Sequence, residues 1–126
     1  MLPFILLGFV VAIAVILIGR SYTSRHITKY SREEADERVA SGKALYLDVR
    51  TDKERQATVI KKSLHIPLAE LSDRIEELER HRKKEIIAYC RTGTRSLAAA
   101  DVLDKAGYQS ANLTRGIGIG KGGGGS

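Results

Sequence analysis

The chain has 126 residues, enough for one domain and an accessory segment. Its single cysteine, Cys90, excludes an intramolecular disulfide and fits either a reducing compartment or a free reactive thiol. The net charge is +6, but residues 1–32 contain four basic residues and no acidic one, which leaves 17 Lys and Arg against 15 Asp and Glu in the remainder. This distribution favours a membrane-proximal basic segment over a nucleic-acid surface, and no RNA-binding aromatic motif or zinc-finger spacing occurs.

Residues 2–19 form an uncharged run of 18 residues. As a helix this run would extend about 27 Å at ~1.5 Å per residue, close to the roughly 30 Å of a bilayer core. No basic side chain precedes it and residues 19–22 make a poor cleavage site, so an uncleaved anchor is favoured over a signal peptide or a buried core helix. The basic residues that follow predict a bacterial-type, single-pass inner-membrane protein whose domain faces the cytoplasm: Arg20, Arg25, Lys29 and Arg32.

A basic linker is expected over residues 20–26, followed by a folded domain over 27–116. Two capping boxes mark helix starts within the domain, Ser31 with Glu34 and Thr51 with Glu54. The first of these helices is expected to end near Gly42. The apolar run 44–49 between the two boxes is typical of a buried strand.

The remaining elements alternate between strand and helix patterns. A short strand is expected over 63–66, an amphipathic helix from Leu68 to Leu78, a strand over 86–89, a helix over 96–106 and a last strand within 108–113. This alternation predicts an α/β fold with a parallel sheet covered by helices on both faces. Residues 117–126 are glycine-dominated and are expected to form a flexible tail, either an engineered linker or a natural low-complexity end.

Cys90 stands where the strand over 86–89 gives way to a tight loop and then a helix. Backbone N–H groups of such a loop and of the first helical turn converge on an anion, with the helix dipole behind them. That environment favours the thiolate, which is the nucleophilic form of cysteine. Arg91 and Arg95 add positive charge, and Gly93 allows a positive φ. The alternative is a small buried hydrophobe without chemistry.

Asp48 lies near the end of the strand over 44–49, an unusual place for a carboxylate in an apolar run. It is either an exposed strand terminus or a carboxylate that fixes a neighbouring loop by hydrogen bonds. Because ligands bind at the carboxyl ends of parallel strands, Asp48 and Arg50 are expected near the Cys90 loop.

From about residue 27 to 116 the chain resembles a single-domain rhodanese, a thiosulfate sulfurtransferase-like domain. The resemblance rests on Leu47-Asp48-Val49-Arg50, on the region from Glu54 to Pro67, on Cys90-Arg91-Thr92-Gly93-Thr94-Arg95-Ser96, and on the closing Gly107-Tyr108 and Leu113. The tryptophan that usually ends the family pattern is absent here.

The resemblance implies sulfur transfer through a persulfide on Cys90, with thiosulfate as a donor and cyanide or a thiol as the acceptor. It implies an active loop formed by Arg91, Thr92, Gly93, Thr94, Arg95 and Ser96, with the two arginines binding the sulfonate end of the donor. Asp48 and Arg50 would support this loop, Arg50 from its rim. No cofactor and no metal are expected, since His26, His65 and His81 lack ligand spacing.

Three alternatives remain open at this stage. The domain could carry or sense persulfide sulfur for a protein acceptor at the membrane without turnover, because a carrier and an enzyme need the same loop. A cysteine phosphatase or arsenate reductase usually has its arginine six residues after the cysteine, whereas Arg95 is five residues after Cys90. A catalytically inactive binding module is disfavoured by the intact loop.

Overall fold

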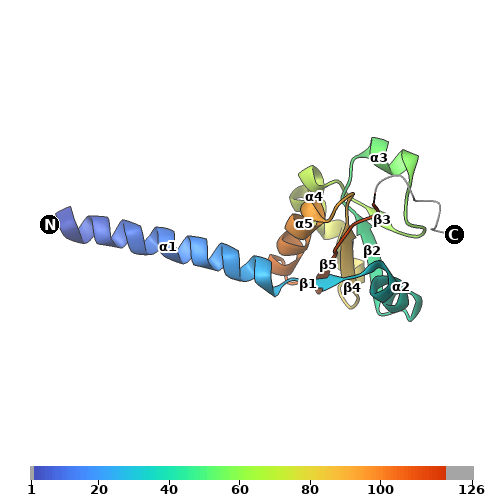
Figure 1. Ribbon diagram of the computed structural model, residues 1–126, viewed down its shortest axis with the longest axis horizontal. Helices are drawn as coiled ribbons and strands as arrows, with labels where there is room; N and C mark the ends of the chain where they lie inside the picture. Colours follow the sequence, from blue (N-terminus) through green and yellow to red (C-terminus); the bar gives the residue numbers. More distant parts are fainter. Residues whose placement is uncertain (1, 119–126) are drawn as a thin grey trace.

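A computed structural model describes the backbone of residues 2–118 and the side chains of residues 4–16 and 26–118. A long N-terminal helix leads into an α/β domain (Figure 1). The elements in chain order are α1 Leu2–His26, β1 Thr28–Tyr30, α2 Arg32–Ala40, β2 Ala44–Asp48, α3 Asp52–Ala57, β3 Leu64–His65, α4 Leu68–Arg74, the 3-10 helix η1 Ile75–His81, β4 Glu85–Tyr89, α5 Thr94–Lys105 and β5 Ser110–Leu113.

The described strands form one five-stranded sheet in the order β1-β5-β4-β2-β3. Every pairing in it is parallel. This arrangement confirms the predicted α/β class. Strand β4 lies at the centre of the sheet. Cys90 follows it directly and therefore lies at the middle of the edge formed by the carboxyl ends of the strands, where parallel sheets bind ligands.

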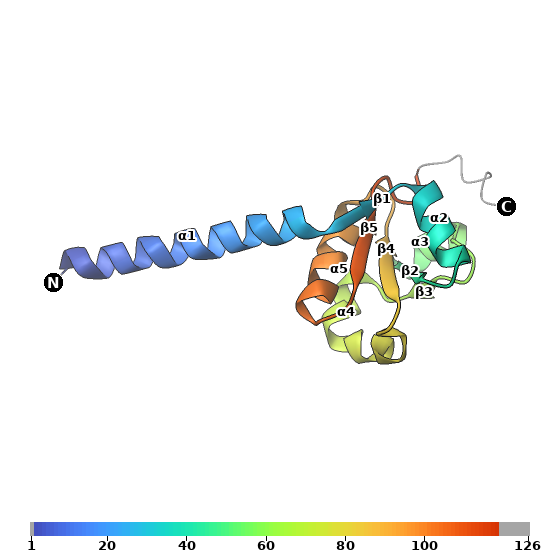
Figure 2. The same ribbon diagram turned by 90° about the horizontal axis from the view of Figure 1, so that it is seen from below.

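Helices cover both faces of the sheet (Figures 1 and 2). Successive side chains of β4 point to opposite faces of the sheet, so two separate cores form. Ile86 and Ala88 pack with α4, η1 and α5 on one face, whereas Ile87 and Tyr89 belong to the core on the other face. Helix α2 contributes Ala35 to that second core. Both cores are fully buried around β4, which gives the loop after it a rigid base.

Both predicted capping boxes are present. The Ser31 hydroxyl accepts from the Glu34 N–H at 3.2 Å while the Glu34 carboxylate accepts from the Ser31 N–H at 3.3 Å. The Thr51 hydroxyl and Glu54 make the same reciprocal pair at the start of α3. These contacts satisfy N–H groups that have no partner within the helix.

The N-terminal segment differs from the expectation. Helix α1 continues to His26, so residues 20–26 extend the helix instead of forming a linker. That stretch contains no glycine or proline that would end a helix. Its large apolar side chains in the range 4–16 are between 53% and 79% exposed.

Among the residues that the structure describes, no helix has both the length and the apolar character required for a membrane span. The predicted transmembrane helix over residues 2–19 is therefore not supported.

The C-terminal boundary also differs. Residues 117 and 118, expected in the flexible tail, belong to the fold: the Ile117 N–H donates to the Cys90 carbonyl at 2.8 Å, and the Gly118 N–H donates to the Arg91 carbonyl at 3.1 Å. Ile117 also packs against the core formed with α2. The rest of the predicted tail, 119–126, lies outside the described residues.

Candidate active site

Cys90 leaves the end of β4 and is 1% exposed. Two backbone N–H groups point at its sulfur: that of Gly93 lies 3.1 Å from Sγ and that of Ser96 lies 3.3 Å from it. The Ser96 hydroxyl oxygen is also 3.3 Å from Sγ. The sulfur therefore lies in a ring of donors at the N-terminus of α5, the arrangement that stabilises an anion.

Gly93 gives this loop its shape. It precedes α5 with φ at 99°, a left-handed conformation that glycine adopts without a steric penalty. A Cβ at this position would overlap the carbonyl oxygen of Thr114, which follows β5. Only glycine allows the loop to lie this close to the C-terminal segment while its N–H points at Cys90.

Two opposing effects set the acidity of Cys90. Burial disfavours the charged form and would by itself raise the pKa of the thiol, but hydrogen bonding with Ser96 and donation from the N–H groups of Thr92 and Gly93 outweigh it. The pKa of Cys90 consequently lies below its ordinary value, so more of the protein carries the reactive thiolate near neutral pH.

The other loop residues are arranged on the outside of this ring. Arg91, Thr92 and Thr94 are exposed, and the two threonine hydroxyls approach to 3.5 Å. Arg91 is therefore an exposed cationic residue next in sequence to the buried Cys90.

Arg95 is tied to helix α3. Its two terminal nitrogens donate to the two carboxylate oxygens of Glu54 at 2.7 and 2.8 Å. This bidentate bond lowers the pKa of Glu54 to about 2, more than enough to offset the effect of burial. To bind the sulfonate of a donor, as the resemblance implies, Arg95 would have to share its guanidinium with Glu54 or leave it.

Asp48 and Arg50 form a buried ion pair behind the loop. Asp48 is fully buried, and its carboxylate accepts from Arg50 Nη2 at 2.9 Å, Arg55 Nη1 at 3.2 Å and the Tyr89 hydroxyl at 3.1 Å. Arg50 also donates to the Thr58 carbonyl at 2.6 Å. Its side chain is only 3% exposed, so it lies beneath the site and not on the rim as expected.

Asn112 is a polar residue at the site that the sequence analysis did not identify. It lies on β5, opposite Ala88 of β4, and is 4% exposed. Its Oδ1 accepts from the Ser96 hydroxyl at 2.5 Å and its Nδ2 donates to the Gly93 carbonyl at 3.2 Å. The available signal was a polar side chain between the apolar Ala111 and Leu113.

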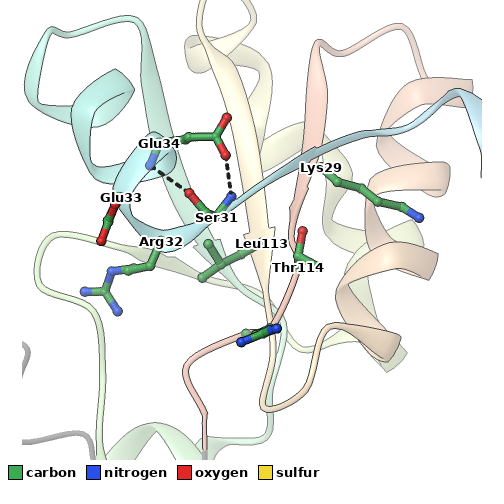
Figure 3. A pocket seen from close by; sticks show the side chains of 9 residues that line it. Lys29, Ser31, Arg32, Glu33, Glu34, Leu113 and Thr114 are labelled. Carbon is green, nitrogen blue, oxygen red and sulfur yellow. Dashed lines mark hydrogen bonds between the residues drawn. The ribbon is translucent and has the colours of Figure 1, made fainter.

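A cavity of about 550 Å³ opens beside the Cys90 loop, at the same edge of the sheet. Figure 3 shows it between the start of α2, with its capping box, and the end of β5. It is lined by Lys29, Ser31, Arg32, Glu33, Glu34, Leu113, Thr114, Arg115 and Gly116. A Cβ on Gly116 would overlap the Cys90 carbonyl oxygen, so this wall of the cavity is in direct contact with the loop.

Within residues 4–16 and 26–118, no three His, Cys, Asp or Glu side chains lie close enough together to hold a metal ion.

Comparison with known proteins agrees with this geometry. The model of the rhodanese-like domain matches residues 31–118. YtwF of Bacillus subtilis, named as a candidate sulfurtransferase, is 30% identical over 92 residues, which cover 72% of this chain and 87% of that protein.

Two solved structures are also similar. The human single-domain sulfurtransferase TSTD1 is 25% identical, with a TM-score of 0.60, over 68% of this chain and 88% of that one. The reduced CoADR-RHD of Bacillus anthracis is 35% identical, with a TM-score of 0.67, over 72% of this chain but only 16% of that one. The chain belongs to the rhodanese-like family, and a sulfurtransferase type of function is supported at the level of that family.

Proposed function

We propose that this protein transfers sulfane sulfur from a donor such as thiosulfate to a thiophilic acceptor through a persulfide on Cys90. The observation that carries the proposal is the convergence of the Gly93 and Ser96 N–H groups on a buried sulfur. Both the thiolate and the persulfide are anionic, and fixed backbone donors stabilise such anions without a proton transfer.

In the first step the Cys90 thiolate attacks the outer sulfur of thiosulfate. A sulfur–sulfur bond to Cys90 forms, the sulfur–sulfur bond of thiosulfate breaks, and sulfite leaves with the electron pair. In the second step an acceptor attacks the outer sulfur of the persulfide. Cyanide becomes thiocyanate, or a thiolate becomes a persulfide, and the Cys90 thiolate is regenerated.

Turnover tests this proposal. Full-length protein supplied with thiosulfate and cyanide is expected to form thiocyanate well beyond one equivalent, and Cys90→Ser to form none, because a hydroxyl is not an adequate sulfur nucleophile at neutral pH. Asp104→Asn, an exposed residue near the opposite end of α5 from the Cys90 loop, is the control and should retain activity. Equal thiocyanate formation by Cys90→Ser would contradict the proposal.

A persulfide carrier or sensor for a protein acceptor is the second candidate, supported by the near-complete burial of Cys90. A carrier would load one sulfur and release it only slowly to small acceptors. The same assay separates the two functions, since a carrier would keep its sulfur as a persulfide and form thiocyanate only slowly even with both substrates in excess.

Phosphatase chemistry is disfavoured, because the guanidinium of Arg95 is held by Glu54 and the loop is one residue shorter than the usual phosphatase pattern. Hydrolysis of p-nitrophenyl phosphate that depended on Cys90 would restore that alternative.

The inner-membrane location with the domain facing the cytoplasm stays a prediction from the basic residues after the apolar segment. Labelling of Cys90 with an impermeant thiol reagent in intact and in permeabilised cells would test it, because the protein is folded in both samples and only access across the membrane differs. Protection in intact cells is expected, and equal labelling without lysis would contradict this orientation.

A further inference from the structure

The hydroxyl group of Ser96 has one proton and two neighbouring acceptors. Its oxygen lies 3.3 Å from the sulfur of Cys90 and 2.5 Å from Oδ1 of Asn112. All three side chains are buried, with 1%, 0% and 4% exposure for Cys90, Ser96 and Asn112. Because no more than one of the two acceptors can receive the proton in a strong hydrogen bond, they compete for it.

The orientation of the Asn112 amide is fixed by a second contact. Its Nδ2 donates to the Gly93 carbonyl at 3.2 Å, so the amide oxygen must face Ser96. The parallel pairing of β5 with β4, which places Asn112 opposite Ala88, holds the side chain under the loop. The Ser96 oxygen therefore lies closer to Oδ1 of Asn112, which is oriented to accept its proton, than to the sulfur of Cys90.

We propose that Asn112 is a positioning residue that holds the Ser96 hydroxyl proton away from Cys90 and thereby limits how strongly the site stabilises the thiolate. The proposal deepens the proposed sulfur transfer and rests on it for its biological meaning.

The two protonation states of Cys90 differ in how this chain of hydrogen bonds is satisfied. In the thiol form the S–H donates to the Ser96 oxygen and the Ser96 hydroxyl donates to Asn112, so every group has a partner. In the thiolate form Ser96 either stays with Asn112, leaving only backbone donors on the sulfur, or turns to the sulfur and leaves a buried amide oxygen unpaired. Either way the thiolate form of the site has one hydrogen bond fewer than the thiol form.

This restraint has a use in a two-step transfer. A thiolate of lower pKa is more abundant, but it is a weaker nucleophile and a better leaving group. By keeping the pKa of Cys90 from falling further, Asn112 would favour attack on the donor while the backbone donors still stabilise the thiolate released in the second step.

The test is the pH dependence of iodoacetamide alkylation in the full chain, read by intact mass on the only cysteine, with Asn112 replaced by leucine. Asn112→Leu removes the acceptor at similar size, and the Gly93 carbonyl keeps the Leu97 N–H as a partner. The pH at which the alkylation rate is half-maximal is expected to fall by about half to one pH unit, which is the equivalent of one hydrogen bond gained by the thiolate. An unchanged or higher midpoint would overturn the proposal.

A double-mutant cycle separates positioning from a general structural effect. In the Ser96→Ala background there is no hydroxyl proton to release, so adding Asn112→Leu should leave the midpoint unchanged. An equal shift in both backgrounds would show that Asn112 does not act through Ser96. If Asn112→Leu fails to fold, Asn112→Val removes the same acceptor with a residue suited to a strand.

The charged groups of the site are kept constant across these variants: Arg91 in the loop, Arg95 on α5 with Glu54, Asp48 with Arg50 behind the loop, and Arg115 after β5.

A separate experiment tests the proposed function, in which each variant is incubated with thiosulfate and its mass is measured. Absence of a persulfide in the unmodified protein would remove the sulfurtransferase proposal, while the alkylation midpoints would still decide the role of Asn112.

Discussion

At the scale of single residues, the site depends on one sulfur and the groups that donate to it. Burial works against the Cys90 thiolate, and hydrogen bonds from the start of α5 more than compensate. A buried thiol without such donors would have a raised pKa and little reactivity. This balance lowers the pKa of a cysteine that is only 1% exposed, as its proposed role as a nucleophile requires.

The bond between Glu54 and Arg95 joins the Cys90 loop to α3 and leads to a pH-dependent prediction. The pKa of Glu54 is lowered from 4.5 to about 2, so the bond stabilises the folded state above pH 4.5 and this contribution is lost as pH falls toward 2. Glu54→Gln should reduce the free energy of unfolding at pH 7 by about 0.5–1 kcal/mol, because the pair is partly exposed.

Glutamine can still serve in the capping box, so this change isolates the charge. Urea unfolding at pH 7 and at pH 2 measures the effect, and the difference between the two proteins should be much smaller at the lower pH, where Glu54 is about half protonated. A difference that stayed constant between pH 7 and pH 2 would show that the charge of Glu54 does not contribute.

At the scale of elements, the C-terminal segment after β5 fixes the outer side of the Cys90 loop. Gly116 has φ at 58°, and a Cβ there would overlap the Cys90 carbonyl oxygen. Gly116→Ala should therefore destabilise the fold by about 1–3 kcal/mol and displace the loop, because backbone atoms cannot move aside cheaply.

Gly118→Ala is the matched control for Gly116→Ala. Gly118 also has a positive φ, at 79°, but no atom lies within 4 Å of a Cβ at that position. Thermal unfolding together with the alkylation rate of Cys90 compares the two variants. Equal losses in both would mean that backbone conformation alone, and not contact with the loop, sets the requirement for glycine.

The sequence was sufficient to predict the elements whose signals are local. The two capping boxes, the strand before Cys90 and the helix after it each depend on residues within one or two turns of chain. One local prediction was only partly right: the apolar spacing from Leu68 to Leu78 indicated one helix, whereas the chain tightens into a 3-10 turn at Ile75.

Contacts between distant residues could not be predicted in the same way. Glu54 and Arg95 are 41 positions apart, and Ser96 and Asn112 are 16 apart. Both contacts require the strand order and the register of the sheet, which local periodicity does not specify. Ile117 was assigned to the tail for the same reason, since no local pattern in a glycine-rich stretch indicates the hydrogen bond from its N–H to the Cys90 carbonyl.

At the scale of the whole molecule, a rhodanese-like domain carries a long helix that projects away from it (Figures 1 and 2). The helix meets the domain near α5, whereas Cys90 lies at the carboxyl edge of the sheet. The proposed sulfur transfer therefore needs only groups of the domain, with Cys90 as the residue that receives and releases sulfur.

Intact-protein mass spectrometry would detect this persulfide directly, with spectra taken before thiosulfate, after thiosulfate, and after a final addition of cyanide. The proposed transfer predicts a gain of about 32 Da, the mass of one sulfur, confined to Cys90 and lost again on addition of cyanide. A folded protein that gains no mass from thiosulfate, or whose adduct survives in Cys90→Ser, would contradict it.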